Sequence, residues 1–321
     1  MSIKKVVLAK PRGFCAGVDR AIDVVTMALQ LYGSPVYVRK EIVHNIYVIR
    51  SLAAKGAVFV DDLDEVPNGS VTIFSAHGVS PEVRAMASAK SLKVIDATCP
   101  LVTKVHMEAL RYAGDDRSII LVGHAGHDEV IGTMGEVPGR IQLVGSVAEA
   151  EKVHVPDPDR VAVTTQTTLG VDDANLIIDV LRRRFPNLIT PTADDICYAT
   201  QNRQTAVKIL AEDADLVLVL GSANSSNSRR LREVAEGGGA KAFLIDDASE
   251  IDPAWLYGVE CVAITAGASA PEYLVQQVVD YFRTRGVEQV EEVMAIEEKV
   301  TFLLPLELSR EVSARGLTQI S

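Results

Sequence analysis

The sequence lacks several features that would place the protein in a familiar class. No apolar run in its 321 residues is long enough to span a bilayer. The N-terminal segment has too few apolar residues to form the core of a signal peptide. It contains no G-x-x-x-x-G-K-[ST] motif, and no flavin or dinucleotide fingerprint is evident. We therefore expect a cytoplasmic protein with no membrane partner and no P-loop nucleotide site.

Positive charge is also scarce. The chain has 32 Lys and Arg residues against 43 Asp and Glu residues, and its formal net charge is −11. Because phosphate backbones demand a basic footprint, this balance argues against nucleic acid as the main partner. A small phosphorylated substrate is still compatible with the sequence, since a local pocket can oppose the global field.

The cysteines are few and contain no C-x-x-C pair of the kind found in structural zinc sites. Cys15, Cys99 and Cys197 each lie where a short loop gives way to an amphipathic helix pattern, at spacings of about one small α/β domain. A helix N-terminus stabilises a thiolate, so the pattern suggests a metal or iron–sulfur site with three protein ligands and one open position. Three-thiolate zinc and scattered core cysteines are the alternatives. Cys261 lies in an apolar run and is predicted to be a core residue of a buried strand.

A repeated pattern of apolar strand, polar loop and helix predicts an α/β fold with mostly parallel sheets covered on both faces. In such sheets the loops at the carboxyl ends of the strands carry the ligand site. We place domain boundaries just before the second and third cysteines. The predicted parts are residues 1–96, 97–194 and 195–288, followed by a C-terminal extension, 289–321, of extended segments and a mobile tail.

Three histidines lie in or beside loops near predicted strand ends: His44, His77 and His127. His77 and His127 are predicted to precede helices directly, where backbone N–H groups favour an anion. A structural role for each ring is the alternative. Glu129 falls in the first turn of a predicted helix, where an acid often only complements the helix dipole. Beside an open metal position it would instead deliver a proton.

Two further loops are rich in hydroxyls and amides. Residues 222–228 and 266–272 each precede a predicted helix and offer neutral donors to a phosphate. The candidates are Ser225, Ser226 or Ser228, Asn227 and Ser269. Ordinary helix capping is the alternative, with Ser269 as cap of the helix begun by Pro271. The segment TQTT at another strand end supplies Thr167 or Thr168.

Nine motifs together resemble the 4-hydroxy-3-methylbut-2-enyl diphosphate reductase family of the non-mevalonate isoprenoid pathway. In the family's order these are PRGFCAGVDRAI, EIVHN, SAHGVSP, DATCPLVTKVH, GHDEVIGTMG, TQTTL, DDICYATQNRQ, GSANSSNS and TAGASAPE. They span residues 11 to 272. The family is similar in fold to the repeats described above, with three α/β domains in a pseudo-threefold trefoil around a central cluster.

The resemblance implies a role for each candidate. Cys15, Cys99 and Cys197 would ligate a [4Fe–4S] cluster and leave one iron open. Glu129 would be the proton source, and Thr167 would position the substrate hydroxyl. The residues implied to bind the diphosphate are His44, His77, Ser225, Asn227 and Ser269, with Ser226 close by. His127 is also implied to lie in the substrate pocket.

The implied reaction is a two-electron, two-proton reductive dehydroxylation of an allylic alcohol diphosphate, which gives isopentenyl or dimethylallyl diphosphate. A ferredoxin or flavodoxin is the expected electron donor. The family often has proline where this chain has Asp128, which puts an extra carboxylate near the proton path. Two other functions stand beside the reductase: a cluster-dependent hydro-lyase that needs no electrons, and a non-enzymatic iron or redox sensor.

Overall fold

The structure is a computed structural model that describes residues 3–316. The chain forms two compact units. The first unit contains residues 3–16, 44–48 and 198–300. The second unit contains residues 17–43, 49–197 and 301–316.

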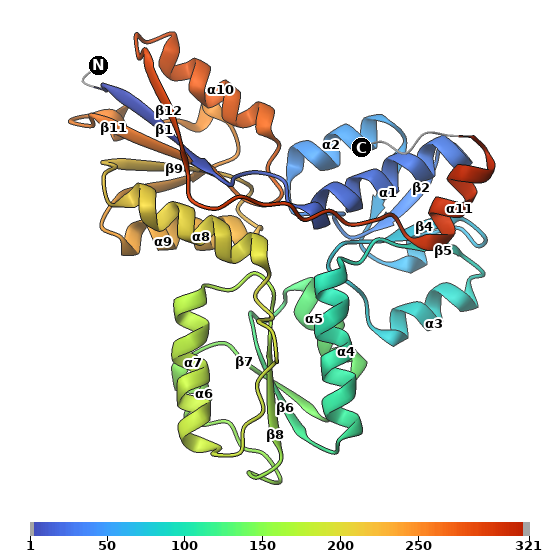
Figure 1. The fold of residues 1–321 in the computed structure, drawn as a ribbon. Coiled ribbons are helices and arrows are strands. Elements are labelled where there is room, and N and C mark those ends of the chain that lie inside the picture. Colours follow the sequence, from blue (N-terminus) through green and yellow to red (C-terminus); the bar gives the residue numbers. More distant parts are fainter. Residues whose placement is uncertain (1–2, 317–321) are drawn as a thin grey trace. The chain divides into compact units, whose positions relative to one another are not determined.

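The first unit is built on one parallel sheet with the strand order β10-β9-β11-β1-β12 (Figure 1). Its strands are β1 Lys5–Lys10, β9 Leu216–Leu220, β10 Lys241–Ile245, β11 Cys261–Ala266 and β12 Gln289–Met294. Its helices are α8 Tyr198–Ala211, α9 Ser226–Gly237 and α10 Glu272–Arg283, with 3₁₀ turns at Ala248–Glu250 and Pro253–Leu256.

Side chains alternate between the two faces of this sheet, as expected for strands buried on both sides. Val6 and Leu8 of β1 pack in one core cluster with Val275 of α10. Val7 packs in a second cluster with Val207 of α8. The sheet is therefore covered on both faces by helices.

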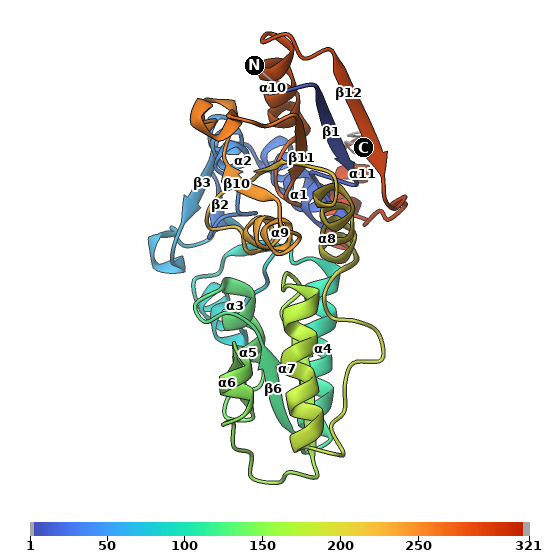
Figure 2. The same cartoon turned by 90° about the vertical axis from the view of Figure 1, so that its left-hand side faces the viewer.

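The second unit holds two smaller parallel sheets, with strand orders β3-β2-β4-β5 and β7-β6-β8. Most of these strands are labelled in Figure 1, and β3 is labelled in Figure 2. The first consists of β2 Val36–Arg39, β3 Ala57–Val60, β4 Val71–Phe74 and β5 Lys93–Asp96, and the second of β6 Ser118–Val122, β7 Ile141–Val144 and β8 Val161–Thr165. The helices are α3 Pro81–Ala89, α4 Pro100–Gly114, α5 Asp128–Glu136, α6 Val147–Ala150, α7 Val171–Arg184 and α11 Leu306–Ala314, with a 3₁₀ turn at Leu63–Glu65. Helices α1 Ala16–Tyr32 and α2 Ile46–Ala54 each begin in the first unit and continue in the second.

These observations confirm the α/β class and the parallel sheets. The trefoil arrangement and the boundaries after residues 96, 194 and 288 stay predictions. Cys261 is the first residue of β11 and is only 7% exposed, so its predicted place in a buried strand is confirmed. Among the described residues, no helix is both long enough and apolar enough to cross a membrane.

The C-terminal extension differs from its prediction. The extended segment at β12 is confirmed, but the predicted extended segment that follows ends in helix α11. Pro305 stands at the helix start, and Leu308 and Val312, four residues apart, are both buried on one face. The predicted mobile tail falls partly on residues 317–321, which lie outside the described part of the chain.

Candidate functional site

The three cysteines occupy equivalent places in the fold. Each directly precedes a helix: α1 begins at Ala16, α4 at Pro100 and α8 at Tyr198. This confirms the predicted loop-to-helix position. All three are half-buried, and none of the described cysteines forms a disulfide.

The same backbone anchor recurs at all three cysteines. Each cysteine N–H donates to a carbonyl that lies two residues beyond the end of a parallel strand. The three bonds are Cys15 N to Ala268 O (3.3 Å) after β11, Cys99 N to Ala76 O (3.0 Å) after β4, and Cys197 N to Thr167 O (3.0 Å) after β8. The strand-end loops therefore determine where each thiol lies.

One of these loops also holds Glu129. The backbone N–H of Thr167 donates to Glu129 Oε1 at 2.7 Å, and its hydroxyl donates to Oε2 at 2.9 Å. The Thr167 carbonyl accepts from Cys197, as described above. A single threonine thus connects the carboxyl group to the loop that carries a cysteine.

Glu129 lies in the first turn of α5, as predicted, and is 2% exposed. Burial raises the pKa of this carboxyl to about 7, although the two hydrogen bonds from Thr167 lower it. The neighbouring acid that adds to the rise in pKa is Asp195. The sequence singled out Asp128 as the disturbing carboxylate and did not point to Asp195, which comes close only through the folding of the chain.

His77 and His127 lie together in the second unit. Their rings meet edge to face, with centroids 5.7 Å apart. Nδ1 of His127 accepts from the backbone N–H of Glu129 at 3.2 Å, so a neutral His127 ring carries its proton on Nε2. Ser75 Oγ lies 3.2 Å from Nδ1 of His77.

The two histidines differ in their relation to helices. His127 is the N-cap of α5, which confirms that it directly precedes a helix. The same prediction is wrong for His77, because α3 begins only at Pro81 and its cap is Ser80. Gly78, with a φ of +80°, turns the chain between the histidine and the helix.

In the first unit, the start of α9 is tightly packed. Ser225 is the N-cap, and its hydroxyl accepts from Ser228 N at 3.3 Å and lies 3.0 Å from Ser228 Oγ. A Cβ at Gly221 or Gly267 would come within about 2 Å of Ser228 Oγ, so only glycine fits at either position. The sequence offered Ser226 or Ser228 as a phosphate donor. The Ser228 hydroxyl instead packs against Gly221 and Gly267 and bonds to Ser225.

Asn227 has the most unusual side chain in this loop. It is buried, yet neither its amide oxygen nor its amide nitrogen has a hydrogen-bond partner within the described part of the chain. Buried polar groups are nearly always paired, and an unpaired one calls for an explanation such as a missing ligand. Ser226 lies beside it and is also buried.

Ser269 connects the loop after β11 to His44. Its hydroxyl donates to the His44 carbonyl at 2.9 Å. The prediction that Ser269 caps a helix is wrong, because α10 begins at Glu272 and Pro271 stands at its N-cap without a side-chain bond. Asn45, which the sequence offered in EIVHN but which we did not single out, caps α2 by accepting from Tyr47 N and Val48 N.

Each unit therefore gathers part of the predicted set. The first unit holds Cys15, His44, Ser225, Ser226, Asn227 and Ser269. The second unit holds Cys99, Cys197, His77, His127, Glu129 and Thr167. In both units these residues lie at strand ends and helix starts, where a parallel α/β fold binds its ligands.

Fold and loops together define an α/β protein with three cysteines at equivalent helix starts and a buried acid that Thr167 connects to the loop of one of them. The chain belongs to the LytB protein family, which matches residues 6–283.

Named relatives agree with this membership. The chain is 59% identical to the 4-hydroxy-3-methylbut-2-enyl diphosphate reductase of Acidothermus cellulolyticus over 98% of its length and 92% of that protein. It is 57% identical to the enzyme of the same name from Bordetella pertussis, over 96% of this chain and 95% of that one. The solved structure of the E-1-hydroxy-2-methyl-but-2-enyl-4-diphosphate reductase from Plasmodium falciparum superposes with a TM-score of 0.95 at 38% identity, covering 98% of this chain and 99% of that one.

Proposed function

We propose that this protein is an oxidoreductase that converts (E)-4-hydroxy-3-methylbut-2-enyl diphosphate to isopentenyl diphosphate and dimethylallyl diphosphate. The reaction consumes two external electrons and two protons, breaks the C–O bond of the allylic alcohol and releases water. The observation that carries the proposal is Glu129, a buried carboxyl with a pKa of about 7, which Thr167 connects to the Cys197 loop. Relatives named for this reaction, at 55–59% identity over nearly the whole chain, support it.

The proposed cofactor is a [4Fe–4S] cluster held by Cys15, Cys99 and Cys197. The donor set fits such a group, because three half-buried thiols outside disulfides stand at helix starts, where thiolates are stabilised. When bound, the cluster would supply electrons and a Lewis-acidic iron that the protein does not ligate.

Glu129 is the proposed proton donor. With a pKa of about 7 a substantial fraction of its side chains, about half, holds a proton at pH 7, unlike an ordinary glutamate. The two bonds from Thr167 fix both carboxyl oxygens, so the orientation of the group does not depend on the substrate. Delivery of this proton to the substrate hydroxyl turns it into water, a good leaving group.

The proposed diphosphate contacts are neutral donors and histidines. In the first unit, Asn227 offers an unpaired amide beside the N-terminus of a full helix, where an anion is favoured. We assign Ser225, Ser226, Ser269 and His44 to the same task. In the second unit, His77 and His127 provide ring N–H groups, and the Nε2 proton of neutral His127 is one of them.

The electron donor is proposed to be a ferredoxin or flavodoxin, and the compartment the cytoplasm. The net charge of −11 argues against nucleic acid as a partner.

The test is anaerobic purification of the full chain, followed by iron and sulfide analysis and turnover with a chemical reductant. We expect about four irons per chain, formation of both isoprenoid diphosphates, and two electrons consumed per product. Turnover without any reductant would instead mean a hydro-lyase. An intact cluster with no affinity for the allylic diphosphate would mean a sensor.

A further inference from the structure

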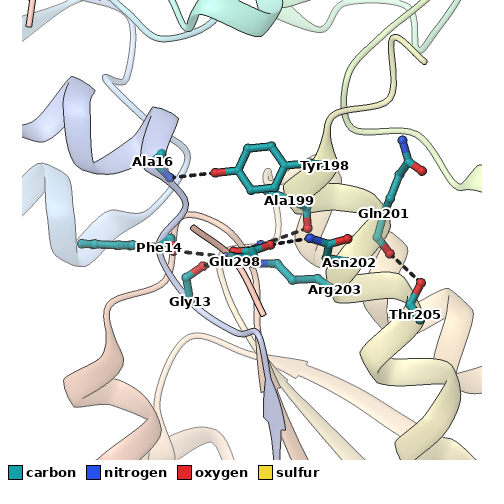
Figure 3. A network of polar contacts seen from close by, with 10 residues as sticks. All are labelled: Gly13, Phe14, Ala16, Tyr198, Ala199, Gln201, Asn202, Arg203, Thr205 and Glu298. Atoms are coloured by element: carbon teal, nitrogen blue, oxygen red, sulfur yellow. Dashed lines mark hydrogen bonds and ion pairs between the residues drawn. The ribbon is translucent and has the colours of Figure 1, made fainter. Parts of the chain in front are cut away.

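A buried arginine holds the loop in front of Cys15. Arg203 of α8 donates to Gly13 O from Nη2 at 2.7 Å and from Nε at 3.1 Å, and to Phe14 O from Nη2 at 3.1 Å (Figure 3). Its Nη1 donates to Ala199 O and to Glu298 Oε1, at 3.0 and 3.1 Å. All five guanidinium N–H donors are thus matched, in a side chain that is 0% exposed.

A second arginine holds the loop in front of Cys99. Nη1 of Arg20, on α1, donates to Ala97 O at 3.1 Å and to Thr98 O at 3.0 Å. Its Nε donates to Leu303 O at 2.8 Å. As at Cys15, the acceptors are the carbonyls of the two residues that precede the cysteine.

A lysine holds the loop in front of Cys197. Nζ of Lys104, on α4, donates to Ala193 O at 2.8 Å, to Asp194 O at 3.2 Å and to Asp195 Oδ1 at 2.9 Å. Asp195 in turn accepts from the end of β8, at Thr164 Oγ1 and Thr165 N. The loop is therefore tied on one side to the lysine and on the other to a strand.

The three cations follow a cyclic order. Arg20 lies five residues after Cys15 on the helix that this cysteine begins, and it binds the loop of Cys99. Lys104 lies five residues after Cys99 and binds the loop of Cys197. Arg203 lies six residues after Cys197 and binds the loop of Cys15, which closes the cycle.

This repetition is not explained by packing. Burying a guanidinium is costly unless it is fully hydrogen-bonded, and a methionine would fill similar space without that cost. At the second cysteine the helix itself gives no such support, because Cys99 stands at the N-cap of α4 without a side-chain capping bond. At Cys15 and Cys99 the arginine binds the carbonyls of the two preceding residues and so fixes the peptide planes from which the cysteine projects. At Cys197 the lysine fixes the loop two to four residues earlier.

We propose that Arg20, Lys104 and Arg203 are positioning residues for the three sulfur ligands, each carried by the helix after one cysteine and bound to the loop before the next. The inference rests on the proposed cluster and adds these three residues to its supporting shell. Outer partners of this kind typically change metal affinity by about 10–100-fold when removed.

The variants are Arg20→Met, Lys104→Met and Arg203→Met, each paired with the conservative change Arg20→Lys, Lys104→Arg or Arg203→Lys. Arg203→Met leaves Glu298 without its ion-pair partner, although Asn202 still donates to it. Arg203→Lys and the two other cations keep the test decisive if that variant does not fold. Arg184→Met is the matched control. Arg184 is also half-buried and donates to two backbone carbonyls, Ala150 O and Val153 O, but its loop carries no cysteine.

The first readout is the rate of cluster loss to a chelator in the anaerobically purified full chain, well below the unfolding temperature. We expect about 10–100-fold faster loss in the three methionine variants, substantial rescue in the conservative variants, and an unchanged rate in Arg184→Met. Loss rates in the methionine variants equal to the wild-type rate, or equal acceleration in Arg184→Met, would overturn the proposal.

The second readout is amide hydrogen exchange, which separates local positioning from general destabilisation. Arg20→Met should speed exchange about tenfold or more around Cys99 only, Lys104→Met around Cys197 only, and Arg203→Met around Cys15 only. Uniform acceleration over the chain would refute the cyclic assignment. The proposed function fails separately, if the wild-type chain itself binds no iron and sulfide.

Discussion

The residues at the start of α9 and the surroundings of Glu129 are both buried and polar, but their hydrogen bonding is opposite. At the start of α9, the amide of Asn227 is buried without a partner within the described part of the chain. At Glu129, both carboxyl oxygens accept bonds from Thr167. An unsatisfied amide is costly until a ligand arrives, whereas a satisfied carboxyl is already in its working geometry. The first region is thus built to bind and the second to react.

The two regions also differ in the source of their charge. The α9 loop offers hydroxyls and an amide, and the charge that favours an anion there comes from the helix start. The region of Glu129 holds a carboxyl whose pKa of about 7 keeps it largely protonated below neutrality. A neutral acid does not repel a diphosphate, so both regions are compatible with the same anionic substrate.

The largest expected effect comes from removing a ligand of the proposed cluster. Cys99→Ser should lose most of its iron and sulfide and reduce turnover by about a thousandfold or more, because one thiolate ligand is gone. Cys261→Ala is the control, since Cys261 lies in strand β11. Unchanged iron content in Cys99→Ser, measured by metal analysis, would show that Cys99 is not a ligand.

The next effect isolates the reacting region. Glu129→Gln should lower kcat by about 10²–10⁴-fold, the usual contribution of a general acid, with diphosphate affinity and cluster absorbance unchanged. Asp128→Asn is the matched control one residue away and should retain nearly full kcat. Loss of the cluster in Glu129→Gln would instead make Glu129 a structural residue.

A smaller effect isolates the binding region. Asn227→Ala should weaken substrate binding by about 10–100-fold, equivalent to about 1–3 kcal/mol, with kcat at saturation retained. Thermal unfolding of the unliganded variant should occur at or above the wild-type temperature, because an unpaired buried amide is removed. Asn224→Ala, an exposed neighbour, serves as control. Equal affinity in Asn227→Ala and wild type, measured by calorimetry, would remove Asn227 from the diphosphate site.

The smallest effect is in the pH dependence. The kcat of the wild type should fall about tenfold per pH unit above about pH 7 as Glu129 loses its proton, and Glu129→Gln should lack this decrease.

Folding raises the pKa of Glu129 above its ordinary value of 4.5, so its contribution to stability is fully present below pH 4.5 and is lost as pH rises to about 7. Urea unfolding of both proteins between pH 4.5 and 8 checks the sign. A wild-type kcat that is flat from pH 6 to 9 would contradict the assigned pKa.

The sequence predicted the local positions of the candidate residues better than the contacts between them. Local patterns place Cys15, Cys99, Cys197 and Glu129 at helix starts, because loop-to-helix transitions depend on nearby residues. The same local reasoning was wrong for His77 and for Ser269, since α3 begins only at Pro81 and α10 at Glu272 with Pro271 as its N-cap. Boundaries at this scale depend on cap geometry that a pattern does not resolve.

Other residues were missed in the sequence for a different reason. Arg20, Lys104, Arg203 and Asp195 act through partners that lie between 30 and 190 residues away in the chain. Taken alone, each reads as an ordinary charged residue of a helix or loop. The sequence shows only that each cysteine is followed five or six residues later by a cation. Neighbouring residues do not indicate which loop each cation binds.

The most direct test of the division between binding and reaction is single-turnover kinetics at increasing substrate concentration, with reduced, cluster-loaded protein. The account predicts that Asn227→Ala reaches the wild-type rate at saturation and that Glu129→Gln stays about 10²–10⁴-fold slower at every concentration. The reverse pattern, with Glu129→Gln recovering at high substrate and Asn227→Ala remaining slow, would contradict it.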